Sequence, residues 1–170
     1  SAMSVIINRH RGTIIEFEGD AILTVFGAPL NQPDHARRAV DTAVEMLEEV
    51  ERLNVRWDAD GTSEHWRGIG MSNFRVRVGV HSGPVVVGNV GSESRTKYAV
   101  IGDTVNIAAR VESMNKVLRT TLLLTRPTVE AIADPEWSLR DLGEQEVRGR
   151  REPVHVYTIE GLPKLEKAET

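Results

Sequence analysis

The hydrophobic pattern of the chain changes its period sharply near the amino end. Gly12 to Phe26 alternates apolar and polar side chains around Glu18-Gly19-Asp20, which predicts a β-hairpin closed by a tight turn. From Pro33 onward the apolar side chains recur at helical spacing instead. The stripe that they form consists of Ala36, Ala39, Val40, Ala43, Leu47 and Val50. A helix with one apolar stripe packs on a sheet, so we expect an α+β fold.

Downstream of this helix, short apolar runs alternate with polar connections. Asn54 to Asn73 is polar and longer than most connections in a compact domain, so we expect a mobile or partner-contacting loop. Residues 163–170 are rich in Lys and Glu and are expected to form a flexible tail behind a single domain, residues 1–162. The other predicted elements are strands at Arg75–Val80, Pro84–Asn89 and Thr121–Thr125, a short helix at Pro127–Ala133 and a closing hairpin.

The stretch KYAVIGDTVNIAARVES, Lys97 to Ser113, is predicted to run from a strand through a glycine into a second helix capped by Asp103. The side chains expected to face the core are Ile107, Val111 and Met114. Asn106 and Arg110 lie one helical turn apart on another face, so both side chains reach into one space. A guanidinium beside an amide suits negative charge that develops on a phosphate, which suggests phosphoryl-type chemistry. Solvation of the helix surface is the alternative interpretation of this pair.

Composition narrows the class of protein. A chain of 170 residues with 40% hydrophobic content can bury one core. It has no run of eighteen apolar residues, so we expect no direct membrane contact from this segment. It contains no cysteine, which fits a cytoplasmic location, whether the domain belongs to a soluble or a membrane-tethered protein. A net charge of −4 argues against nucleic acid as a partner, so local arginines would have to bind any triphosphate.

Four blocks of the chain, in this order and with ordinary spacing, resemble the class III nucleotidyl cyclases. They are IIEFEGDAILTVFGAP (Ile14–Pro29), FRVRVGVHSGPVVVGNVGS (Phe74–Ser92), KYAVIGDTVNIAARVES (Lys97–Ser113) and EVRGRREPVHVYTI (Glu146–Ile159). The family comprises phosphorus-oxygen lyases of signal transduction that convert ATP or GTP into a 3′,5′-cyclic nucleotide and pyrophosphate. The resemblance implies a ferredoxin-like fold, with an antiparallel-rich sheet and helices on one face.

The chain departs from the family at its amino end. The family's first strand ends in a phenylalanine-x-aspartate-isoleucine motif whose aspartate binds both catalytic metal ions, and no segment here matches it. Ser4 to Arg11 is predicted to be the end of the helix before the hairpin, and Ser1-Ala2-Met3 resembles a cloning remnant. We therefore expect the chain to lack that strand and that aspartate. Its own activity should be near background, and a longer parent should be active.

The resemblance also assigns roles to matching residues. Asp20 would bind Mg²⁺ or Mn²⁺, two ions being held in the complete site. Asn106 would orient the ribose, and Arg110 would stabilise charge on the α-phosphate. Arg77 and Arg148 match positions that hold the β- and γ-phosphates, although the second position is lysine in much of the family.

Two further positions would read the purine. Glu16 would favour GTP over ATP, because a carboxylate accepts hydrogen bonds from the N1 and 2-amino groups of guanine. Ala99, at the partner position, cannot hydrogen-bond either purine, so the choice between ATP and GTP stays open. The family implies a head-to-tail homodimer in which Asp20 and Arg77 come from one subunit and the remaining site residues from the other. The competing hypothesis is a catalytically silent, cyclase-like module that binds a nucleotide or a protein.

Overall fold

A four-stranded mixed sheet forms the centre of the fold. The computed structural model of the chain describes residues 1–70, 73–92, 95–147 and 150–165. The strand order is β3-β6-β8-β7, in which β3 and β6 are parallel and the other neighbours are antiparallel. The strands are β3 (Val78–Val80), β6 (Leu122–Thr125), β8 (Val154–Ile159) and β7 (Leu139–Gln145), and the flanking helices are α2 (His35–Ala59), α4 (Asp103–Leu118) and α5 (Arg126–Glu130). The predicted α+β class is confirmed.

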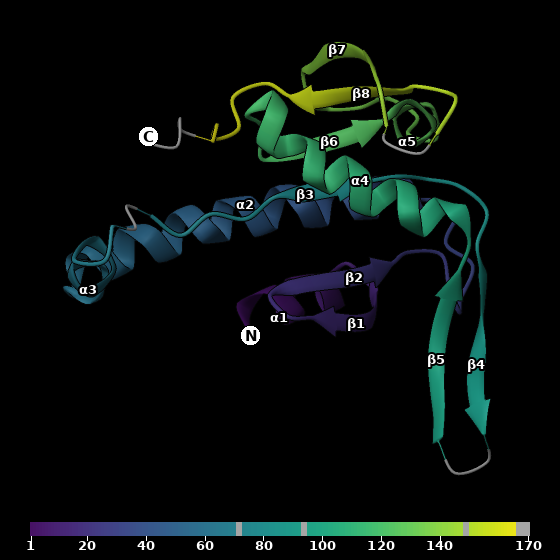
Figure 1. Cartoon of the computed structure of the whole chain (residues 1–170), viewed down its shortest axis with the longest axis horizontal. Helices are drawn as coiled ribbons and strands as arrows, with labels where there is room; N and C mark the ends of the chain where they lie inside the picture. The colour runs from purple at the N-terminus through teal and green to yellow at the C-terminus, as the bar shows by residue number, and fades with distance from the viewer. Residues whose placement is uncertain (71–72, 93–94, 148–149, 166–170) are drawn as a thin grey trace.

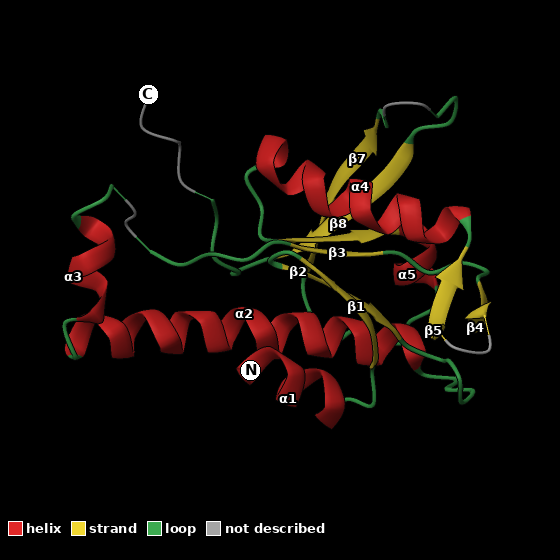
Figure 2. Cartoon of the chain, turned by 60° about the horizontal axis from the view of Figure 1, so that its bottom comes forward, coloured by secondary structure: helices red, strands yellow, loops and turns green. Residues whose placement is uncertain are grey.

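Helices cover both faces of this sheet. The central strand β6 is buried along its whole length. Leu122 and Leu124 pack with the apolar stripe of α2, whereas Leu123, which points the opposite way, packs on Val111 of α4. Figure 2 shows α2 on one side of the strands and α4 on the other. The expectation of helices on one face was wrong, because a strand that is apolar on both faces needs cover on both.

The first long helix extends through much of the segment that was predicted to be a loop. α2 continues to Ala59, and α3 (Thr62–Arg67) follows it directly. Trp57 on α2 and Trp66 on α3 meet edge to face, with ring centroids 4.8 Å apart. The loop prediction for Asn54 to Asn73 was wrong for most of this stretch, because the aromatic contact stabilises a polar helical hairpin that has no clear apolar period. Among the described residues, no helix is long and apolar enough to cross a membrane.

Two further hairpins form sheets of their own (Figure 1). The first pairs β1 with β2 around Gly19 and Asp20, as predicted, and the second pairs β4 with β5. The strands are β1 (Thr13–Glu18), β2 (Ala21–Val25), β4 (Val86–Ser92) and β5 (Arg95–Ile101). In Figure 1 the β4-β5 hairpin projects away from the rest of the molecule. Much of its surface is therefore available to another molecule.

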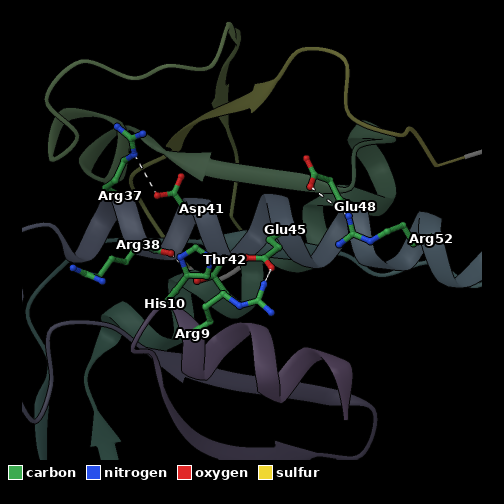
Figure 3. Close-up of polar contacts among 9 residues, drawn as sticks. All are labelled: Arg9, His10, Arg37, Arg38, Asp41, Thr42, Glu45, Glu48 and Arg52. Atoms are coloured by element: carbon green, nitrogen blue, oxygen red, sulfur yellow. Dashed lines mark hydrogen bonds and ion pairs between the residues drawn. The ribbon is translucent and has the colours of Figure 1, made fainter.

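Helix α1 (Ala2–Arg9) contacts both β1 of the first hairpin and α2. Ile6 and Ile7 on α1 are buried. His10 Nε2 lies 2.6 Å from Glu45 Oε2 on α2, and Arg9 forms an ion pair with the same carboxylate (Figure 3). The predicted helix before the hairpin is confirmed, and its contacts join the β1-β2 hairpin to α2.

Strand β3 passes very close to α4 at Gly79. A Cβ at this position would lie 2.3 Å from the backbone nitrogen of Glu112 and 2.8 Å from the carbonyl oxygen of Ala108. We expect Gly79→Ala to lower the free energy of unfolding by ~1–3 kcal/mol or more, because strand and helix would have to separate. Urea denaturation measures this loss, and Gly88→Ala is the control, since nothing lies within 4 Å of a Cβ there. Equal stability of the two variants would contradict the close approach.

Candidate functional site

Strand β5 leads directly into α4 through Gly102. This glycine occupies the N-cap position with φ +154°, and Asp103 is the first residue of the helix. The prediction that Asp103 caps α4 was therefore wrong. The Asp103 carboxylate forms an ion pair with Arg150 instead. The negative charge still lies in the first turn, where the helix dipole stabilises it. The turn thus fixes the direction in which α4 leaves the β4-β5 hairpin.

Asn106 and Arg110 project from α4 away from the core. Ile107 and Val111 are buried in the cluster beneath α4, whereas Asn106 is exposed and Arg110 is partly exposed. Within the described part of the chain, neither the Asn106 side chain nor the Arg110 side chain makes a hydrogen bond or an ion pair. The amide and the guanidinium therefore keep all their N–H donors for a ligand. This is the orientation that the sequence predicts.

Arg77 lies just before β3, and its guanidinium faces α4. Its Nε donates a hydrogen bond of 2.7 Å to Oε1 of Glu112, two residues after Arg110 in the chain. The two side chains are 33% and 34% exposed. The Nε–H is one of the five N–H donors of a guanidinium. The contact with Glu112 uses this donor and leaves the four donors on the terminal nitrogens of Arg77 for other partners. Arg77 thus lies beside α4, with its charge partly balanced by a carboxylate.

Two other basic side chains, Arg150 and His81, lie near the charge of Asp103 at the start of α4. Arg148 lies outside the described residues, and Arg150 pairs with Asp103. His81 Nδ1 is 2.8 Å from Oγ1 of Thr125. Burial lowers the pKa of His81 below its ordinary 6.5, and the charge of Arg150 lowers it further, while that of Asp103 opposes the shift. His81 is therefore uncharged at neutral pH, and arginines have to supply the positive charge for an anion here.

Asp20 is exposed at the tip of the β1-β2 hairpin. Glu18 pairs with Ala21, so Gly19 and Asp20 form a two-residue loop, and the positive φ of Gly19, +62°, matches a type II′ turn. The carboxylate oxygens of Asp20 suit Mg²⁺ or Mn²⁺. However, the described residues contain no group of three or more His, Asp or Glu side chains that could hold a metal ion. Asp20 by itself does not fit a two-metal site.

The two positions expected to read a purine lie on neighbouring hairpins. Glu16 is on β1, and Ala99 is on β5, opposite Gly88 of β4. Lys97, also on β5, forms an ion pair with the Glu16 carboxylate. Our sequence predictions did not include Lys97. Its place two residues before Ala99, on the same face of a strand, was the available signal.

The structure thus places two groups of polar side chains along the β5-α4 segment, and Glu16 of β1 joins the first of them. Glu16 and Lys97 meet where β1 faces β5, and Asn106 and Arg110 follow on α4, just after the turn. The first group offers carboxylate acceptors and ammonium donors, and the second offers the donors of a guanidinium and an amide together with one amide oxygen as an acceptor. Among the described residues, no hydrogen bond or ion pair joins Asp20 to either group. The arrangement can bind a planar polar ring at one end and phosphate oxygens at the other.

Comparison with known proteins agrees with this geometry. The family model described as "Adenylate and Guanylate cyclase catalytic domain" matches residues 1–161. The chain is 35% identical over 159 residues to "Adenylate cyclase 1" of Rhizobium meliloti (strain 1021), an alignment that covers 94% of the chain and 22% of that protein. The chain thus spans less than a quarter of the length of this relative.

Solved structures support the fold. The chain superposes on the guanylyl cyclase Cya2 with a TM-score of 0.74 and 36% identity, over 95% of the chain and 76% of Cya2. It superposes on the adenylyl cyclase CyaB from P. aeruginosa with a TM-score of 0.75 and 31% identity, over 93% of the chain and 76% of CyaB. One of these two proteins is described as a guanylyl cyclase and the other as an adenylyl cyclase. The comparisons therefore leave the choice between guanine and adenine open.

Proposed function

The chain belongs to the adenylate and guanylate cyclase catalytic domain family, and we propose that, once its metal site is complete, it converts ATP or GTP into the 3′,5′-cyclic nucleotide and pyrophosphate. The 3′-oxygen of the ribose attacks the α-phosphorus, and the bond from that phosphorus to the bridging oxygen of the β-phosphate breaks. The 3′-hydroxyl proton passes to solvent, and pyrophosphate leaves. The observation that carries this proposal is the pair of uncommitted side chains, Asn106 and Arg110, one turn apart on α4.

Four polar residues, two of them on α4, have distinct tasks in this reaction. Asn106 hydrogen-bonds the ribose and orients its 3′-hydroxyl toward the α-phosphate. Arg110 donates to the oxygens of the α-phosphate, whose charge grows in the transition state. The terminal nitrogens of Arg77 bind the outer phosphates, with Glu112 holding the guanidinium through Nε. Arg148 is proposed for the same phosphates, although it lies outside the described residues.

Asp20 is the residue proposed to bind a divalent cation. A bound Mg²⁺ or Mn²⁺ lowers the pKa of a hydroxyl and neutralises phosphate charge. Two cations need more carboxylate ligands than Asp20 supplies, and the described residues contain no group of three or more potential metal ligands. We therefore assign metal binding to Asp20 alone and expect the remaining ligands to lie outside the described residues or on the substrate.

A second copy of the chain is proposed to complete the site. The projecting β4-β5 hairpin exposes Val86, Val90 and Ile101, at 71%, 51% and 58% of their surface. Val86 and Ile101 are cross-strand partners, and such an apolar hairpin face is suited to burial against another subunit. A head-to-tail pairing would also bring Asp20 of one subunit to α4 of the other, which explains why the two are not joined within one chain.

Product analysis tests the proposed reaction. The 170-residue chain and the full-length protein are each incubated with ATP or GTP and with Mg²⁺ or Mn²⁺. We expect the full-length protein to release cyclic nucleotide and pyrophosphate in equal amounts, as measured by mass spectrometry and a pyrophosphate assay. The chain alone should be near background, because its described residues contain no group of three or more His, Asp or Glu side chains that could hold a metal ion. Rapid turnover by the chain alone would contradict the need for further metal ligands.

The second candidate function, a silent nucleotide-binding module, is favoured by one observation. No group of three or more potential metal ligands forms among the described residues, Asp20 included, and a cyclase site that lacks a metal ligand would bind nucleotide but not cyclise it. Nucleotide binding by the full-length protein without cyclic product under either metal would support the silent module and contradict catalysis.

A further inference from the structure

The ion pair between Glu16 and Lys97 joins two hairpins that are distant in the sequence. Glu16 belongs to β1 and Lys97 to β5, and these strands are in contact. The side chains remain 37% and 57% exposed, so both keep polar atoms that a ligand could reach. Ala99 lies two residues after Lys97 on the same face of β5 and contributes no polar side-chain atom. The polar side chain that β5 contributes here is therefore Lys97.

We propose that Lys97 is a specificity-determining residue that reads the purine together with Glu16, and that this pair selects guanine. The inference rests on the proposed cyclase function, because it assigns a base to the nucleotide of that same site. Lys97 supplies from β5 the hydrogen bond that Ala99 cannot make.

Matching of donors and acceptors favours guanine over adenine. The edge of guanine presents the O6 acceptor followed by two donors, the N1–H and the 2-amino group. The two oxygens of Glu16 accept from the two donors, and the ammonium of Lys97 donates to O6. All three groups of guanine are then satisfied. Adenine presents one donor and one acceptor on the same edge, so it would use only one oxygen of the Glu16 carboxylate.

The ion pair also makes this selection physically reasonable. A lone carboxylate in a nucleotide site adds a negative charge close to a triphosphate, whereas the Glu16–Lys97 pair is neutral. In addition, a site built for particular hydrogen bonds discriminates strongly against a base that leaves them unpaired. Lys97 thus both balances the charge of Glu16 and completes the set of donors and acceptors.

The test compares Lys97→Met with the unaltered full-length protein. Methionine keeps much of the apolar stem and removes the ammonium. Lys116→Met is the matched control, because Lys116 is an exposed lysine on α4 with no ion pair in the described part of the chain. Binding is measured by calorimetry with 3′-deoxy-GTP, 3′-deoxy-ITP and 3′-deoxy-ATP, which lack the attacking hydroxyl, and kcat/KM is measured with GTP, ITP and ATP.

Inosine separates direct reading from an indirect effect. Inosine keeps O6 and N1–H but lacks the 2-amino group. If Lys97 donates to O6, Lys97→Met should weaken guanosine and inosine nucleotides by the same factor, about tenfold or more, and leave adenosine nucleotides nearly unchanged. If Lys97 only positions Glu16, the guanosine nucleotide should lose more than the inosine nucleotide, because only guanosine uses the second oxygen of Glu16.

Equal losses for guanosine and inosine nucleotides, with no effect of Lys116→Met, would support the proposal. An unchanged ratio of GTP to ATP in Lys97→Met, a larger loss for guanosine than for inosine, or a preference of the unaltered protein for ATP would overturn it and leave the cyclase function intact. Failure of the unaltered protein to bind or convert any of these nucleotides would overturn the proposed function, and the assignment of guanine with it.

Discussion

Arg110→Ala in the full-length protein is expected to lower kcat by ~10²–10³-fold while KM changes little. Arg110 keeps its guanidinium donors free on α4, where no described residue pairs with them. A donor that acts mainly on charge developing in the transition state affects kcat more than substrate binding. Steady-state rates of cyclic nucleotide release at several substrate concentrations separate the two parameters.

Two variants on the same helix control this measurement. Lys116→Ala removes an exposed charge from α4 and should leave kcat within about twofold of its normal value, because a lone surface charge contributes little. Arg110→Lys keeps a positive charge but loses the planar fork, so it should recover only part of the rate. A parallel rise of KM in Arg110→Ala with kcat unchanged would show that Arg110 binds substrate and transition state equally.

Asp20→Ala is expected to lower turnover by ~10²-fold or more, because the charge stabilisation provided by a divalent cation is worth several kcal/mol. Mixing this variant with Arg110→Ala should restore activity if each site uses Asp20 of one subunit and Arg110 of the other. Random exchange at equal amounts leaves about a quarter of the sites intact, so the mixture should reach about a quarter of the unaltered rate.

Glu18→Ala is the control for the hairpin, since it removes an exposed carboxylate beside the turn and leaves Gly19 and Asp20 in place. It should keep nearly full activity. Exchange of subunits in the mixture is verified by labelling each variant with a different fluorophore. No recovery despite verified exchange would mean that the site is not shared between subunits, with Asp20 and Arg110 coming from the same chain.

Much of the local structure was predictable, because it follows from residue periodicity. The alternation around Gly19 and Asp20 predicted the β1-β2 hairpin, and the stripe after Pro33 predicted α2. The spacing of Ile107 and Val111 placed Asn106 and Arg110 on the outer face of α4. Each of these features depends on residues close together in the sequence, whose relative positions are set by helix or strand geometry.

The predictions that failed concern segments whose local signal is weak. The composition of Asn54 to Asn73 is typical of a polar loop. In the structure α2 continues into this segment and α3 follows, with Trp57 packed on Trp66. Asn54 also exchanges hydrogen bonds of 2.9 and 3.0 Å with the backbone of Phe74. These contacts join residues that no helical or strand period relates, so the composition of the segment could not reveal them.

The sequence by itself determined which residue types were available for chemistry, and on which elements they would lie. Only the tertiary structure decided their partners: Lys97 with Glu16, Arg77 with Glu112, and Arg150 with Asp103. It also decided that α2 and α4 cover opposite faces of β6. The physical reason is that each of these contacts joins elements whose relative placement depends on packing of the whole core, whereas periodicity reports only on neighbours within one element.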